Sequence, residues 1–152
     1  MGIEEDIQQT RFRNSHQKAA VNLLYTGGWL RDQMKVIFDR EDVTAQQFNI
    51  LRILRGSSPN PLSTLQIRER MLEKMSDTSR LVDRLLAKGL VKKIICKTDR
   101  RLVDILITEK GKKLLQRLDQ HEADMDAILC GLTDKEASQL SDLLDKLRNA
   151  SE

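Results

Sequence analysis

The hydrophobic pattern of this chain changes from helical to strand-like immediately after Gly89. Before this glycine, apolar residues recur at helical spacing over 76–88, and Gly89 is suited to the left-handed cap that ends such a helix. After it, residues 90–97 and 102–107 are rich in β-branched and aliphatic side chains and are joined by the charged segment 98–101. The pattern therefore predicts a helix from about Ser76 to Lys88 followed by a β-hairpin.

Three other helix starts carry a capping-box pattern, in which a hydroxyl and a Glu or Gln three residues later each satisfy a backbone N–H. They begin at Thr44, Ser63 and Thr133. Between the first two, residues 56–61 contain two prolines and predict a turn, because proline cannot continue a helix. The first two boxes thus begin two short helices upstream of the Ser76–Lys88 helix.

Longer helices are expected on both sides of this central part, over residues 11–40 and from Thr108 to about Cys130. The helix over 11–40 is apolar on two sides, which requires two partners, for example its own domain and a second subunit. The expected fold class is mainly α with a small β-hairpin. A winged helix-turn-helix lobe over 41–108 is flanked by helical regions 1–40 and 109–152, and all three form one compact domain.

The charge of the chain is concentrated in its middle. The formal net charge is only +3, but residues 62–104 hold 11 basic and 6 acidic side chains, whereas residues 105–152 hold 7 and 10. A basic segment of this kind favours contact with a polyanion, and a solvated lysine-rich face is the alternative. All five aromatic residues precede the segment. Because single-strand and RNA-binding surfaces commonly stack bases on aromatic rings, double-stranded DNA is the expected polyanion.

On a helical wheel, the Ser76–Lys88 helix separates an apolar side, which includes Thr78, from a polar side. Its candidate DNA-contacting residues are Ser76, Asp77, Ser79, Arg80 and Arg84. Such a slim face can enter the major groove, where arginines can bind guanine or phosphate. Asp77 could accept from cytosine or pair within the helix, and for Asp83 we favour an intrahelical pair with Arg80 or Arg84.

Two further groups of residues are candidates for DNA contact. Ser63, Thr64 and Arg68 lie on the short helix before the recognition helix and are expected to contact the DNA backbone. At the hairpin tip, the candidates are Lys97, Asp99, Arg100 and Arg101. An arginine on a tip of this kind can enter the narrow minor groove, and a solvated turn is the alternative interpretation.

Residues 79–91 resemble the recognition helix of MarR-type (multiple antibiotic resistance) winged-helix repressors. Asp99-Arg100-Arg101, with Thr108-Glu109-Lys110-Gly111 after it, is similar to the wing signature of that family and the helix that follows. The resemblance covers essentially the whole chain. It implies a homodimer held by regions 1–40 and 109–152 and bound to a pseudo-palindromic operator. It also implies that Asp99 orients the wing tip and that Arg101 reaches the DNA.

The resemblance further implies a small aromatic or anionic effector bound between the dimer helices and the DNA-binding lobe. The candidate lining residues are His16, Tyr25, Trp29 and Phe48. Aromatic residues at helical spacing are also typical of a core, and His16 of an exposed helix position. No cysteine precedes Cys96, so the first-helix cysteine of the oxidation-sensing members has no counterpart here. We interpret Cys96 and Cys130 as packing residues.

Other classes of protein fit the sequence less well. The two cysteines match no zinc-binding spacing and no disulfide framework, so we expect no metal, no cofactor and a reducing, cytoplasmic compartment. No apolar run approaches the ~18 residues of a membrane span, and residues 1–10 do not form a secretory signal. An enzyme is disfavoured because no nucleophile elbow or P-loop is present. The remaining alternative is a winged-helix module that docks proteins without specific DNA binding.

Overall fold

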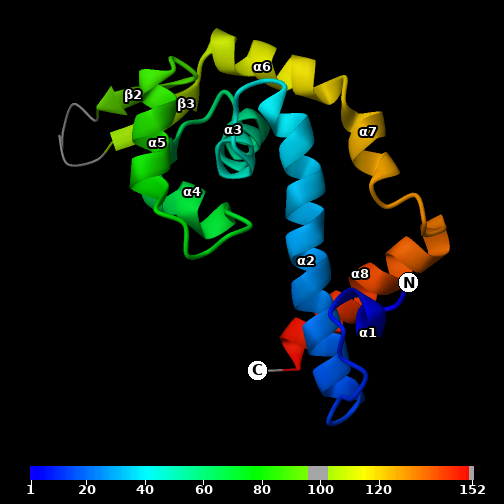
Figure 1. Cartoon of the computed structure of the whole chain (residues 1–152). Coiled ribbons are helices and arrows are strands. Elements are labelled where there is room, and N and C mark those ends of the chain that lie inside the picture. The colour runs from blue at the N-terminus through cyan, green and yellow to red at the C-terminus, as the bar shows by residue number, and fades with distance from the viewer. Residues whose placement is uncertain (96–102, 151–152) are drawn as a thin grey trace.

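The computed structural model describes residues 1–95 and 103–150. Its elements are, in chain order, α1 (Ile3–Asp6), α2 (Ser15–Asp39), α3 (Ala45–Ser57), β1 (Leu62–Ser63), α4 (Thr64–Arg70), α5 (Thr78–Ala87), β2 (Val91–Ile95), β3 (Val103–Ile107), α6 (Glu109–Asp119), α7 (Glu122–Ala127) and α8 (Asp134–Asn149). Figure 1 shows the lobe from α3 to β3 on one side of the long α2 helix, with α7 on the other side. The expected fold class, mainly α with a small β-hairpin, is confirmed.

The small sheet is antiparallel, in the order β1-β3-β2. Strand β2 pairs with β3 from Val91 opposite Ile107 to Ile95 opposite Val103. The two-residue strand β1 pairs with the other edge of β3, with Leu62 opposite Ile105. The sequence did not predict β1, because two residues show no period and only their pairing with β3 defines a strand.

The core of the lobe surrounds α3, which packs against α2, α4, α5, α6 and β3. Its large and almost fully buried side chains are Phe38, Ile50, Leu51, Leu54, Ile67, Leu85, Ile105, Leu115 and Leu118. Phe38 comes from the end of α2, and Leu115 and Leu118 come from α6. The core of the winged lobe therefore includes parts of both flanking helices.

The predicted caps explain where several helices begin. The hydroxyls of Thr44, Ser63 and Thr133 each accept from the backbone N–H three residues later, and the Gln or Glu side chain at that position accepts from the N–H of the cap residue. All three capping boxes are thus confirmed. Gly89, just after α5, has φ +72°, a left-handed conformation that glycine adopts readily.

Three boundaries differ from those expected. Helix α2 begins at Ser15 instead of residue 11, because the Asn14 side chain caps it by accepting from the Gln17 N–H. Helix α5 begins at Thr78 instead of Ser76. The helix expected from Thr108 to about Cys130 is interrupted, since α6 ends at Asp119 and α7 begins at Glu122.

Ion pairs surround this interruption and connect it to neighbouring elements. The pairs are Arg55–Asp119 at 2.8 Å, Arg117–Glu41 at 2.9 Å and Arg40–Asp124 at 2.9 Å. Both α6 and α7 are thus tied to the segment that follows α2, through Glu41 and Arg40, and α6 is tied in addition to Arg55 on α3. The Arg40 guanidinium holds the pKa of the Asp124 carboxyl below its usual value, chiefly through its hydrogen bond.

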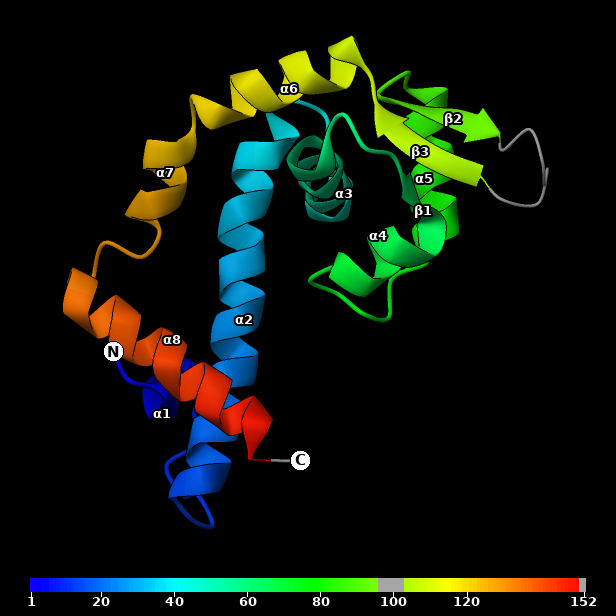
Figure 2. The same ribbon diagram turned by 180° about the vertical axis from the view of Figure 1, so that it is seen from behind.

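The helices away from the lobe expose apolar side chains. Helix α8 has no buried residue, and Leu140, Leu143 and Leu147 on it are exposed. On α2, Leu24 and Trp29 are exposed as well. Figure 2 shows α7 on the side of α2 away from the lobe and α8 crossing the lower part of α2. Among residues 1–95 and 103–150, no helix is long and apolar enough to cross a membrane.

Candidate nucleic-acid interface

Helices α4 and α5 form a helix-turn-helix whose connecting turn is fastened to α3. The Asn49 side chain on α3 accepts from the Leu72 N–H at 2.8 Å. Gln46, one turn earlier, donates to Glu73 at 2.7 Å and to the Ser76 hydroxyl at 3.4 Å. These contacts hold the start of α5 in a fixed position. The sequence analysis did not assign a role to Gln46 or Asn49, because their partners lie more than 20 residues away.

Helix α5 has the two sides that the wheel predicted. Thr78, Leu81, Val82 and Leu85 are buried, whereas Ser79, Arg80, Arg84 and Ala87 are exposed. Arg80 and Arg84 are separated by one helical turn and therefore extend from the same face. A face with a small residue at its start and two arginines behind it is slim enough to approach a DNA groove.

The two aspartates near this face have structural roles. Asp77 precedes α5 and caps it, because its carboxylate accepts from the Arg80 N–H at 3.2 Å. Ser76 and Asp77 were expected to be helical. They lie instead in the turn that leads into α5. Asp83 has an ion pair with Lys93 on β2 at 3.7 Å. We predicted that Asp83 would pair with Arg80 or Arg84 of its own helix. That prediction is wrong, because the partner is a lysine of the neighbouring strand.

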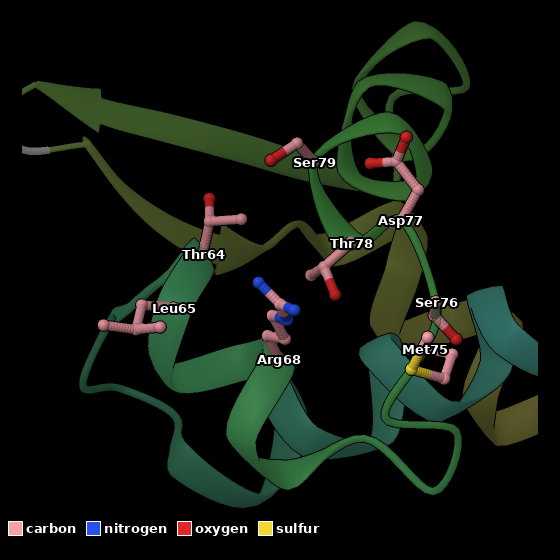
Figure 3. A pocket seen from close by; sticks show the side chains of 8 residues that line it. All are labelled: Thr64, Leu65, Arg68, Met75, Ser76, Asp77, Thr78 and Ser79. Atoms are coloured by element: carbon pink, nitrogen blue, oxygen red, sulfur yellow. The ribbon is translucent and has the colours of Figure 1, made fainter.

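Two adjacent grooves cross this surface, and both are bordered by Thr64, Leu65 and Ser79. The first, of about 400 Å³, is also lined by Arg68, Met75, Ser76, Asp77 and Thr78. Figure 3 shows the Arg68 side chain lying between α4 and the start of α5. The second, of about 480 Å³, extends past Ser63 and Asp83 to Lys93 and Val103 on the sheet. The structure thus gathers the candidates on α4, in the turn and at the start of α5.

Thr78 is unusual among the groove residues. Its side chain is only 4% exposed, and among the described residues its hydroxyl has no hydrogen-bond partner. A buried hydroxyl without a partner is destabilising by about 1–3 kcal/mol. The buried hydroxyl of Thr78 thus lowers the stability of the fold at the point where α5 borders the first groove.

The wing is described only at its base. Strands β2 and β3 position the hairpin beside α5, and Lys92 and Lys93 on β2 are exposed. Lys97, Asp99, Arg100 and Arg101, with Cys96, lie outside the described residues. Their predicted contacts with DNA remain predictions.

The four candidate effector residues do not gather at one place. His16 is exposed near the start of α2, and Tyr25 and Trp29 are exposed one turn apart near its middle. Phe48 packs against Phe38 at the end of α2, with the ring centroids 4.7 Å apart, and belongs to the edge of the core. His16 and Phe38 are separated by a rise of about 33 Å along α2. Cys130 is exposed, contrary to its interpretation as a packing residue.

Comparison with known proteins identifies the family. The family model for the MarR family matches residues 41–102. The chain is 30% identical over 124 residues to the HTH-type transcriptional repressor MdtR of Bacillus subtilis (strain 168), and the match covers 81% of this chain and 79% of MdtR. The chain belongs to the MarR family. MarR-family members are DNA-binding transcriptional regulators and not enzymes, which agrees with the helix-turn-helix and with its exposed arginines.

Two solved structures share the MarR fold seen here. The crystal structure of a mutant MarR from E. coli complexed with operator DNA matches with a TM-score of 0.80 at 21% identity, covering 91% of this chain and 99% of that one. The organohalide-sensing regulator RdhR, in its 2,4-dichlorophenol-bound form, matches with a TM-score of 0.82 at 18% identity, covering 93% and 86%. At these identities the two structures support the fold alone.

Proposed function

We propose that this MarR-family chain is a homodimeric repressor that binds a pseudo-palindromic operator and blocks transcription sterically. The observation that carries the proposal is the exposed face of α5, where Arg80 and Arg84 follow the small Ser79. This face adjoins the grooves bordered by Ser63, Thr64 and Arg68. One surface therefore offers a helix for the major groove and polar groups for the backbone on either side of it.

The arginines are suited to recognising bases. A guanidinium can donate two parallel hydrogen bonds to guanine O6 and N7, and each good pair discriminates by about 1–3 kcal/mol against the wrong base. Ser63, Thr64 and Arg68 would contact phosphates, which fix the position of the protein without selecting a sequence. The wing arginines Arg100 and Arg101 would enter the adjacent minor groove.

The dimer is supported by the apolar residues that the single chain leaves exposed. Leu140, Leu143 and Leu147 follow one stripe of α8, and Leu24 and Trp29 lie on α2. An exposed leucine stripe on an otherwise charged helix is typical of an interface. In the dimer, the two α5 helices would lie about 34–36 Å apart, one turn of DNA.

Release by a small aromatic or anionic effector completes the proposal. RdhR has been solved with 2,4-dichlorophenol bound. In this chain, Tyr25 and Trp29 offer two exposed rings on α2, and the other two proposed lining residues lie towards the start of that helix (His16) and against its end (Phe48). Trp29 is the only tryptophan, so its fluorescence reports binding near α2 directly. A panel of aromatic acids and phenols should contain a member that changes this fluorescence and releases DNA, and a panel that does neither would contradict this part of the proposal.

The experiment that tests the proposal is a selection of random duplex DNA by the purified protein, followed by sequencing of the retained pool. An enriched inverted repeat is expected. Arg80→Ala and Arg84→Ala should each lose the preference at one position of each half-site, with Arg13→Ala, an exposed arginine before α2, as the charge-matched control. A pool without enrichment, or unchanged preference in both variants, would contradict the proposal and favour a protein-docking module.

A further inference from the structure

Leu65 is a strongly exposed apolar residue where the two grooves meet. It is the second residue of α4, its side chain is 63% exposed, and it borders both grooves. The same grooves are lined by five hydroxyl-bearing residues, Arg68, Lys93 and two aspartates, together with the apolar side chains of Met75, Val82 and Val103. In Figure 3, Leu65 lies on the far side of Arg68 from Met75.

The position of Leu65 is fixed by its neighbours along the helix. The Ser63 hydroxyl accepts from the Gln66 N–H at 3.1 Å, and the Gln66 side chain accepts from the Ser63 N–H at 2.9 Å. Two residues later, Ile67 is fully buried in the core. Positions two apart on a helix point to nearly opposite sides, so burial of Ile67 directs Leu65 outward. Leu65 thus belongs to the outer surface of α4 and not to its packing face.

The chemistry of the major groove limits what such a leucine can contact favourably. The base edges there present hydrogen-bond donors and acceptors, and the only apolar group is the 5-methyl of thymine. Packing a leucine against a phosphate or a polar base edge would remove that group from water without giving it a hydrogen bond. Packing it against a methyl group removes apolar surface of both partners from water.

We infer that Leu65 is a specificity-determining residue that recognises thymine through its 5-methyl group. Because Ser79 at the start of α5 borders both grooves with Leu65, the thymine would lie at the margin of the bases that α5 contacts. The inference rests on the proposed function and adds to it one preferred base in each half-site.

The test replaces each thymine of the selected operator, one position at a time, by deoxyuridine, which lacks only the 5-methyl group and pairs identically. Binding of the full-length protein to each duplex is measured by fluorescence anisotropy at fixed salt. One position per half-site should weaken binding by about fourfold, and substitution in both half-sites by about 16-fold, the effect of burying one methyl group and then two. Leu65→Ala should bind the thymine duplex more weakly and make no distinction between thymine and uridine at that position.

Two other variants establish that the effect belongs to Leu65. Leu72 is 82% exposed in the same helix-turn-helix but lines neither groove, so Leu72→Ala should retain full sensitivity to uridine. Met75 is 97% exposed and lines only the first groove. If Met75→Ala abolished the sensitivity and Leu65→Ala left it intact, the assignment to Leu65 would be wrong.

The failure of the inference is distinguishable from that of the proposed function. A random-DNA selection that enriches no sequence contradicts both. An enriched inverted repeat whose uridine-substituted forms all bind as tightly as the original contradicts only the inference about Leu65. An enriched repeat whose preference for thymine is unchanged in Leu65→Ala contradicts it in the same way.

Discussion

Gly111 lies at a close contact between α6 and the end of the sheet. A Cβ atom at this position would lie 2.4 Å from the Leu90 carbonyl oxygen and 2.7 Å from Cγ1 of Ile107. The same junction is tied by Thr108, whose hydroxyl donates to the Gly89 carbonyl at 2.7 Å and accepts from the Gly111 N–H at 3.2 Å. The absence of a side chain at Gly111 therefore allows α6 to begin directly against Leu90, just after α5, and against Ile107.

Gly111→Ala should destabilise the fold by about 3 kcal/mol or more, because the backbone oxygen and the buried isoleucine cannot move aside independently. Urea unfolding followed by circular dichroism measures this change. Gly56→Ala on α3 is the control, since a Cβ there meets no heavy atom within 4 Å. It should stabilise by up to about 1 kcal/mol. Equal stabilities of the two variants would show that the junction is not tight in solution.

Local signals allowed several residues to be predicted from the sequence. Gly89 and the three hydroxyl caps act on backbone groups within four residues, so their patterns are visible without the fold. Gly111 and Asn49 act through partners at positions distant in sequence, and Leu65 is distinguished only by its exposure. The roles that could not be predicted from the sequence are those that depend on the tertiary structure.

At the scale of elements, the joint between α6 and α7 shows why helix boundaries are harder to predict. The apolar pattern continues through the joint with Leu118 and Met125, and neither glycine nor proline marks it. The pairs Arg55–Asp119 and Arg40–Asp124 attach the two sides of the joint to different elements. The helix is thus interrupted by contacts made elsewhere in the fold, and the sequence predicted one helix where two form.

The contact between α7 and the end of α2 should depend on acid pH. The pKa of Asp124 is lowered by Arg40 and, to a smaller extent, by His121. A carboxyl with a lowered folded pKa stabilises the folded state above its unfolded pKa, near 3.8, and this contribution is lost as the pH falls further. The protection of α7 amides, taken as the ratio of intrinsic to observed hydrogen-exchange rate at each pH, should therefore fall below about pH 4 in the wild type. Asp124→Asn should show lower protection already at pH 7, with a smaller change on acidification; unchanged protection at pH 7 would exclude the pair as a support of α7.

At the scale of the whole molecule, the basic side chains are concentrated in the lobe and the acidic ones towards the C-terminal end. Residues 62–104, which carry the excess of basic side chains, include α4, α5 and the hairpin. Sequence reasoning located this surface because charge and helical period are both visible along the chain. The neighbouring grooves could not be predicted in this way, since their walls combine α4, α5 and the sheet.

Affinity for the operator should fall with salt, and Arg101→Ala should flatten that dependence. An arginine that contacts a phosphate or the minor groove releases counterions, so its removal reduces the slope of log K against log salt by about one per subunit. Arg101→Ala should also weaken binding similarly across sequences, in contrast to Arg80→Ala. Anisotropy titrations at four salt concentrations measure the slope. An unchanged slope would place Arg101 away from the DNA.

The leucine stripe of α8 should determine whether the molecule exists as a dimer. Leu143 is 63% exposed in the single chain, and burying such a side chain at an interface is favourable by about 1.5–3 kcal/mol. Light scattering of the wild type should give twice the chain mass of 17.5 kDa. Leu143→Asp would place two charges at the interface and should yield monomers that bind a half-site weakly. Ser138→Asp, on the opposite side of α8 at 100° per residue, is the control and should remain dimeric. A wild type of monomer mass, or a dimeric Leu143→Asp, would remove α8 from the interface and with it the expected spacing of the two recognition helices.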